Sequence, residues 1–228
     1  MFDSARVLGL SDAGGLGDWG EGGPYRSEEQ CKTLLESLLQ PLGWSRADTL
    51  ASRLINEFGS LPAILAAGPD ALKACIPDDH NAVDFLMVVR ATMLHSLRIE
   101  ARRGPVFSTS EALINYLLAS MAYASSEHLR VLFLNASNSL LRDEVMGKGS
   151  VTQAPIYPRE IMKRALELGA TALILVHNHP SGDPYPSRGD IEATERIVAA
   201  ASALEIAIHD HLVIAKSGWT SFRERGLL

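Results

Sequence analysis

The chain reads ALILVHNHPSGDPYPSRGD from Ala172 to Asp190. The apolar start of this stretch predicts a buried strand, and His177 and His179 follow at its end. Residues at i and i+2 of a strand point to the same face, so the two imidazoles can converge on one ion. A loop rich in proline and glycine then reverses the chain and delivers Asp190 in the first turn of a helix. Two imidazoles and a carboxylate, with a fourth position open for water, are the ligand set of a catalytic zinc site.

Each part of this pattern also has a purely structural interpretation. Histidine is common at polar strand ends, and Ser187 with Asp190 resembles the Ser-x-x-Asp pattern of a helix capping box. The combination of both parts, in this order and across one loop, favours metal binding. A bound zinc ion would lower the pKa of a water molecule to about 7 and polarise a carbonyl group. A separate acid–base residue would then have to take and return the proton.

The region around this motif, residues 106–228, alternates helices and strands. Pro158 at a helix start and Gly169 after its end are the residue types expected at those positions. The alternation predicts a mixed α/β domain built in layers. Predicted helices cover residues 110–118, 158–168 and a segment that begins at Ser187, and predicted strands cover residues 129–134, 140–146, 172–176 and 206–215.

The preceding residues have a different character. Residues 1–25 contain seven of the eighteen glycines, and a segment with so little to bury is predicted to be a flexible tail. Residues 26–103 predict a small all-helical domain, and Arg102-Arg103-Gly104-Pro105 marks its end, so the second domain is predicted to span residues 104–228. The helices of the first domain are expected near residues 34–39, 45–58, 61–67, 69–75 and 81–101.

The composition argues against several classes of protein. The chain has 228 residues, of which 46% are hydrophobic, and a net charge of −6, which argues against a protein that coats nucleic acid by charge alone. Cys31 and Cys75 form no Cys-x-x-Cys pair, which excludes a disulfide scaffold and a thiolate zinc knuckle. No apolar run is long enough to cross a bilayer, and no signal peptide is visible. We therefore expect a cytoplasmic protein without a membrane partner.

The motif resembles the JAMM (MPN/JAB1) metalloprotease pattern, in which a glutamate precedes His-x-His-x7-Ser-x-x-Asp. The closer resemblance is to the bacterial RadC family, and it covers residues 106–228 strongly and residues 26–103 weakly. It implies an α/β (α+β) fold, namely a cytidine-deaminase-like, three-layer MPN/JAMM domain preceded by a small helical domain. The segments that carry it are Pro158-Arg159-Glu160, the run from His177 to Asp183, Asp210-His211 and the closing residues 221–226.

The resemblance implies a role for each residue of the motif. His177, His179 and Asp190 would be the zinc ligands. Ser187 would hydrogen-bond the tetrahedral oxyanion or the bound water. The cofactor implied is Zn²⁺, and the reaction implied is hydrolysis of a peptide or isopeptide-like amide in a peptide or protein substrate.

The resemblance also implies a glutamate at the start of an early strand. Glu127 lies directly before the predicted strand 129–134 and fits that place. It would act as general base and then as general acid. Glu111 and Glu144 are the competitors for this role, and both are expected to face solvent.

Two further features bear on the chemistry. Zinc deaminases share this general fold but need His-x-Glu and Pro-Cys-x-x-Cys, which this sequence lacks, so deamination is not expected. Asp210 and His211 lie on the last long predicted strand. We favour a buried hydrogen-bonded pair that joins two strands, and the alternative is that one of them supports a zinc-binding histidine.

The helical region resembles the helix-hairpin-helix-like N-terminal part of RadC proteins, in which backbone amides at a helix N-terminus bind phosphates. The corresponding hairpin, Ile76-Pro77-Asp78-Asp79-His80, has no glycine and two aspartates, and residues 26–103 contain nine basic and ten acidic side chains. We therefore favour an interaction or scaffold domain over nucleic-acid binding. A DNA-associated accessory protein of the RadC type and a non-catalytic interaction module remain as alternative functions. The sequence does not predict the oligomeric state.

Overall fold

A computed structural model describes residues 28–40, 46–149 and 157–228 of the chain. The predicted tail, residues 1–25, lies outside them. The chain divides into two compact units, residues 1–87 and residues 88–228. This division falls within a helix, whereas the domain boundary expected from the sequence lies near residue 103, so that boundary stays a prediction.

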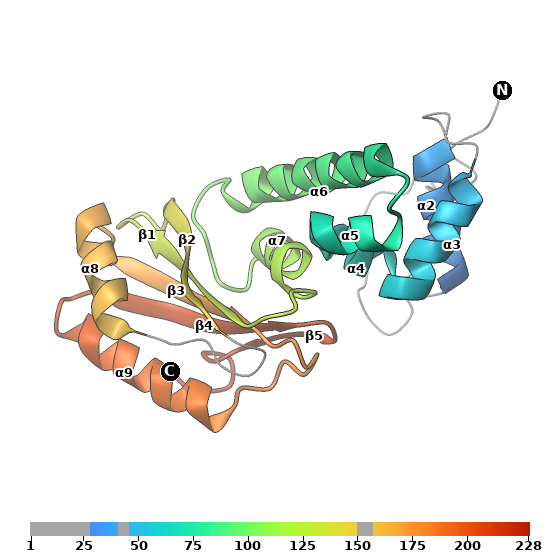
Figure 1. The fold of residues 1–228 in the computed structure, drawn as a ribbon. Helices are drawn as coiled ribbons and strands as arrows, with labels where there is room; N and C mark the ends of the chain where they lie inside the picture. Colours follow the sequence, from blue (N-terminus) through green and yellow to red (C-terminus); the bar gives the residue numbers. More distant parts are fainter. Residues whose placement is uncertain (1–27, 41–45, 150–156) are drawn as a thin grey trace. The chain divides into compact units, whose positions relative to one another are not determined.

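The first unit is helical, as expected. Its described helices are α2 (Glu28–Leu39), α3 (Ala47–Phe58), α4 (Leu61–Ala66), α5 (Pro69–Cys75) and the first part of α6 (His80–Ala101) (Figure 1). Leucines at helical spacing supply the core, because Leu35, Leu39 and Leu54 are fully buried in one apolar cluster. Gly59 ends α3 in the left-handed conformation, with a φ of 79°, which glycine adopts without strain.

The second unit contains a sheet of five strands. They are β1 (His128–Leu134), β2 (Leu140–Lys148), β3 (Ala172–Asn178), β4 (Ala207–Ala215) and β5 (Gly218–Ser221). Their spatial order is β2-β1-β3-β4-β5, and only the β3–β4 pair is parallel. The four longer strands confirm the predicted ones, and the predicted strand 172–176 continues to Asn178. The four-residue β5 was not predicted.

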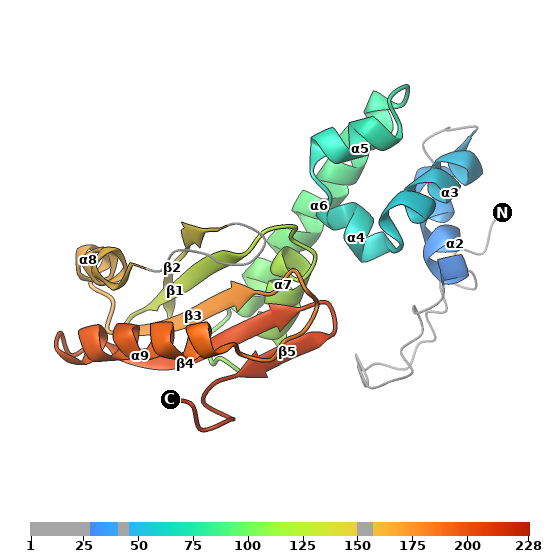
Figure 2. The ribbon, with the colours of Figure 1, turned by 60° about the horizontal axis from the view of Figure 1, so that its bottom comes forward.

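Helices cover both faces of this sheet and make three layers, as the resemblance implied. α8 (Pro158–Leu168) and α9 (Arg188–Ser202) pack on one face, and α7 (Glu111–Met121) packs on the other (Figures 1 and 2). Alternate residues of β3 serve the two faces. Leu173 and Leu175 contribute to the α8/α9 side, and Ile174 and Val176 contribute to the α7 side. This alternation continues along the strand and directs His177 towards α9.

Candidate metal centre

The two histidines of the motif converge as the strand pattern predicts. His177 is the penultimate residue of β3 and is 2% exposed, and His179 follows the end of the strand. The Nε2 atoms of the two rings lie 2.8 Å apart. The backbone N–H of His179 donates to the carbonyl oxygen of Ile214 on β4, which anchors the loop to the sheet.

Asp190 reaches the same point from α9. Ser187 is the N-cap of this helix, and the reciprocal bonds of a capping box join it to Asp190. The Asp190 carboxylate also lies 3.4 Å from Nε2 of His177 and 3.3 Å from Nε2 of His179. The structural and the metal-binding interpretations of this residue are therefore compatible. Burial alone would raise the pKa of Asp190, but the adjacent His177 and His179 rings and the Ser187 hydroxyl outweigh burial and hold that pKa well below its usual range.

Glu127 completes a cluster of four side chains. One ligand atom from each of Glu127, His177, His179 and Asp190 lies within 4.8 Å of the others. Asn178 holds the segment that carries Glu127, because the side-chain amide of Asn178 forms hydrogen bonds to the main chain on both sides of Glu127. The Asn178 Oδ1 accepts from the backbone N–H of His128 at 2.9 Å, and its Nδ2 donates to the carbonyl oxygen of Ser126 at 3.0 Å.

The chemistry of these donors fits a divalent cation. Nδ1 of His179 lies 2.8 Å from the carbonyl oxygen of Asp183. A carbonyl only accepts, so Nδ1 carries the ring proton and Nε2 of the neutral ring presents its lone pair to the cluster. The neighbouring Asp190 carboxylate raises the pKa of His179, although burial opposes it. Two ring nitrogens with two carboxylates thus favour positive charge between them, and this donor set suits zinc.

The two competing glutamates lie outside the cluster. Glu144 on β2 pairs with Arg164 of α8 through two bonds, with Oε1 2.6 Å from Nη2 and Oε2 2.8 Å from Nε. Glu144 was expected to face solvent, and its ion pair with Arg164 was not predicted. Glu111 is exposed in the first turn of α7. Among the three glutamates, Glu127 is the one in the histidine cluster.

Asp210 and His211 are both buried, as the favoured interpretation expects, and their side chains have different partners. The Asp210 carboxylate accepts from Ser221 Oγ at 2.6 Å and from the backbone N–H of Arg223 at 3.1 Å, so it joins β4 to the C-terminal segment. This matches the favoured interpretation. His211 is different, because its Nε2 lies 2.8 Å from Nδ1 of His177. For His211 this contact favours the alternative, support of a motif histidine, and the two side chains have different partners because neighbouring residues of a strand point to opposite faces.

Asn178 and Thr194 are polar residues of the centre that the sequence patterns did not single out. Both are buried, at 1% and 2% exposure. Asn178 lies between the two motif histidines, and Thr194 lies four residues after Asp190 on α9. A polar residue one helical turn from a ligand is a weak signal in a sequence. Thr194 belongs to the centre only because β4, which carries His211, passes beside α9.

The hairpin of the first unit contains no feature that favours phosphate within the described residues. It runs from Ile76, which ends α5, to His80, which begins α6. The Asp79 carboxylate pairs with Arg46 at 3.4 Å. An interaction or scaffold domain stays the prediction for this unit. None of the described helices has the length and apolarity needed to traverse a bilayer.

Comparison with known proteins supports the resemblance found in the motif. The family model described as "RadC-like JAB domain" matches residues 107–227. A protein of Rhodobacter capsulatus named "UPF0758 protein" is 48% identical over 179 residues, which cover 78% of this chain and 84% of the relative. The matched family region contains β1 to β5 and all four residues of the cluster.

Proposed function

Because the chain belongs to the RadC family, we propose that it is a zinc-dependent metallohydrolase that cleaves peptide or isopeptide-like amide bonds in a peptide or protein substrate. The observation that carries this proposal is the convergence of Glu127, His177, His179 and Asp190 within 4.8 Å. Three of these side chains suffice to hold a catalytic zinc ion, and the fourth is then available for proton transfer.

His177, His179 and Asp190 would hold the ion, which when bound lowers the pKa of a water molecule and polarises the substrate carbonyl. The Glu127 carboxylate would accept the proton of the attacking water and donate it to the nitrogen of the leaving amine. The two bonds from Asn178 keep the backbone around Glu127 fixed during both transfers.

Ser187 would act as a hydrogen-bond donor to the oxyanion. Its hydroxyl now donates to Oδ2 of Asp190 at 2.6 Å and accepts from the backbone N–H of Asp190 at 3.2 Å. The proton must therefore turn away from Asp190 before it can serve the substrate. This requirement couples the proposed role of Ser187 to the state of the Asp190 carboxylate.

The test is the metal content of the purified protein, measured by mass spectrometry. We expect about one zinc per chain in the wild type and in Glu127→Gln, and none in His179→Ala, because a site with three protein ligands needs each of them. The exposed His80→Ala is the matched control and should keep its zinc. A folded wild type that takes up no metal after reconstitution contradicts the proposal.

A second measurement separates binding from catalysis. With an isopeptide-linked substrate library, Glu127→Gln should retain zinc but lose roughly 100-fold or more in turnover, the usual contribution of a general acid–base group. If Glu127→Gln turns over as fast as the wild type, the role of Glu127 is wrong even though the metal site is right.

A further inference from the structure

A chain of buried hydrogen bonds runs behind the cluster, from His177 to the main chain of Asp190. Nδ1 of His177 lies 2.8 Å from Nε2 of His211, and Nδ1 of His211 lies 2.6 Å from Oγ1 of Thr194. The Thr194 hydroxyl donates to the carbonyl oxygen of Asp190 at 2.6 Å. The side chains of this chain come from β3, β4 and α9, and His211 is 0% exposed.

The last acceptor in this row of hydrogen bonds determines which atom donates in each of them. The carbonyl oxygen of Asp190 can only accept, so the Thr194 hydroxyl donates there and its oxygen accepts from Nδ1–H of His211. A fully buried ring without a carboxylate partner is neutral, so Nε2 of His211 presents a lone pair. It accepts from Nδ1–H of His177. The remaining nitrogen, Nε2 of His177, must therefore present its lone pair to the cluster.

We propose that His211 and Thr194 are positioning residues that hold His177 in its metal-binding tautomer and tie it to the second ligand, Asp190; the inference rests on the metal site of the proposed function. Metal-binding histidines are usually oriented by an acceptor on their other nitrogen, and loss of that acceptor typically costs 10- to 100-fold in affinity. In this protein the acceptor is a neutral histidine. Phe222 stacks on its ring, with centroids 4.6 Å apart and planes 24° apart, and fixes its orientation.

Paired variants of His211 and Thr194 can separate the effect of the hydrogen bonds from the effect of side-chain volume. His211→Leu fills similar space without an acceptor, whereas His211→Gln offers an oxygen to His177 and an amide to Thr194. Thr194→Val removes the hydroxyl with little change of shape, whereas Thr194→Ser keeps it. Ser221→Ala is the control, because it removes a buried hydroxyl that bonds to Asp210 and does not touch His177.

The experiment measures zinc affinity of the full chain by competition with a chelator of known affinity, and records the visible spectrum of the cobalt-substituted protein. We expect His211→Leu and Thr194→Val to bind zinc about 10- to 100-fold more weakly with an altered cobalt spectrum. His211→Gln and Thr194→Ser should recover most of the affinity, and Ser221→Ala should match the wild type.

Two results overturn the inference, and they differ from failure of the proposed function. If both His211→Leu and Thr194→Val bind zinc with wild-type affinity, the hydrogen bonds through His211 and Thr194 do not position His177. An equal loss in Ser221→Ala shows that the effect is general loosening of the sheet. By contrast, a folded wild type without any metal affinity overturns the proposed function and this inference together.

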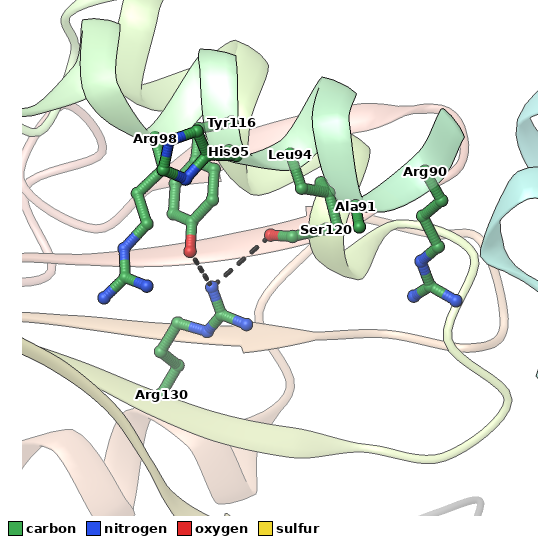
Figure 3. A pocket seen from close by; sticks show the side chains of 8 residues that line it. All are labelled: Arg90, Ala91, Leu94, His95, Arg98, Tyr116, Ser120 and Arg130. Atoms are coloured by element: carbon green, nitrogen blue, oxygen red, sulfur yellow. Dashed lines mark hydrogen bonds between the residues drawn. The ribbon is translucent and has the colours of Figure 1, made fainter. Parts of the chain in front are cut away.

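A second inference rests on an independent cavity on the α7 face of the sheet, opposite the histidine cluster. It has a volume of about 390 Å³. The guanidinium groups of Arg90 and Arg98 extend from α6, and that of Arg130 extends from β1 between them (Figure 3). His95, Tyr116 and Ser120 complete its polar lining.

Arg130 lies between the other two arginines of this cavity, and its side chain is 16% exposed. One of its terminal nitrogens, Nη1, donates to Tyr116 Oη at 3.0 Å and also lies 3.4 Å from Ser120 Oγ and from Asp143 Oδ2. Its Nε is buried and has no hydrogen-bond partner in the described part of the chain. A buried donor without an acceptor is costly. The same guanidinium also pairs with the Asp143 carboxylate, which is 4% exposed.

We infer that this cavity binds a small phosphate-bearing anion. Three guanidinium groups and no carboxylate are among the described residues that line the cavity. Arg130 also pairs with Asp143 behind the lining, and guanidinium groups suit the oxygens of an oxyanion. The test is calorimetric titration of the full chain with inorganic phosphate and with pyrophosphate at low ionic strength. Arg98→Gln, an exposed position, should weaken binding about 10-fold, whereas the exposed control Arg196→Gln on α9 should not. Absence of binding at about 10 mM phosphate, or equal weakening by both variants, overturns this inference.

Discussion

The two units of the chain differ in what they bury. Within the described residues the first unit buries only apolar side chains and Cys31, whereas the second also buries seven polar residues. These seven all belong to the C-terminal part of the sheet and to α9, and they are His177, Asn178, Thr194, Asp210, His211, Thr220 and Ser221.

This difference shows which unit depends on the exact placement of hydrogen-bond donors and acceptors. An apolar interior tolerates changes that keep volume, because its contacts have no direction. A buried polar group needs each hydrogen bond in place, and a missing partner leaves an unsatisfied group at high cost. In the second unit, the side chains that need such exact hydrogen bonds lie around β3 and β4, beside the proposed metal ligands.

Loss of the Asp210 carboxylate should have the largest effect. Asp210→Ala leaves Ser221 Oγ and the backbone N–H groups of His211 and Arg223 without their acceptor, so we expect the free energy of unfolding of the second unit to fall by about 4 kcal/mol. Urea denaturation measures it. Asp210→Asn keeps the oxygen that serves both N–H groups and should cost clearly less. Equal losses in the two variants would contradict this account.

An apolar deletion in the first unit should cost somewhat less and leave the metal site intact. Leu54 is 0% exposed in the helical core, and Leu54→Ala should lower the free energy of unfolding of that unit by about 3 kcal/mol through lost burial and a cavity. Leu54→Met is the volume-keeping control. Denaturation followed together with zinc content checks both points, and a loss of zinc in folded Leu54→Ala would break the contrast between the units.

Removal of the Asn178 amide should have a smaller and more local effect. Asn178→Ala deprives the His128 N–H and the Ser126 carbonyl of their partner, so we expect a loss of about 2 kcal/mol in the free energy of unfolding. The amide hydrogen of His128 should also exchange faster with solvent, as hydrogen–deuterium exchange can show. Asn115→Ala on α7 serves as control. Unchanged exchange at His128 would mean that Asn178 does not hold the Glu127 segment.

The ion pair on the surface of the sheet should matter least. The bond from Arg164 lowers the pKa of Glu144 below its ordinary value of 4.5. A lowered pKa in the folded state stabilises the fold above the ordinary pKa, and this contribution disappears as the pH falls through the lowered value. Glu144→Gln should therefore destabilise slightly at pH 7 and not at about pH 3, because partly exposed pairs contribute little.

Denaturation of the wild type and Glu144→Gln at both pH values measures this difference. Glu195→Gln on α9, which forms no ion pair within the described residues, should show no such pH dependence. A difference between wild type and Glu144→Gln that stays constant from pH 7 to pH 3 would mean that the lowered pKa of Glu144 does not stabilise the fold.

Much of the architecture could be predicted from local sequence patterns. The apolar run before His177 predicted β3, and Pro158 with Gly169 bounded α8, whose end has a φ of 63° at Gly169. These signals are local, because strand alternation and helix termini depend on neighbouring residues. The short strand β5 escaped prediction because four residues carry no periodic pattern, and its pairing depends on β4.

The sequence by itself determined the family, the alternation of helices and strands, and the spacing that places His177, His179 and Asp190 on either side of one loop. Only the tertiary structure decided that Glu127 joins them, that Asn178 holds its segment, and that His211 rather than Asp210 faces His177. The reason is physical. The first group of features follows from contacts close in the chain, whereas the second depends on which strands lie side by side and on the face to which each side chain points.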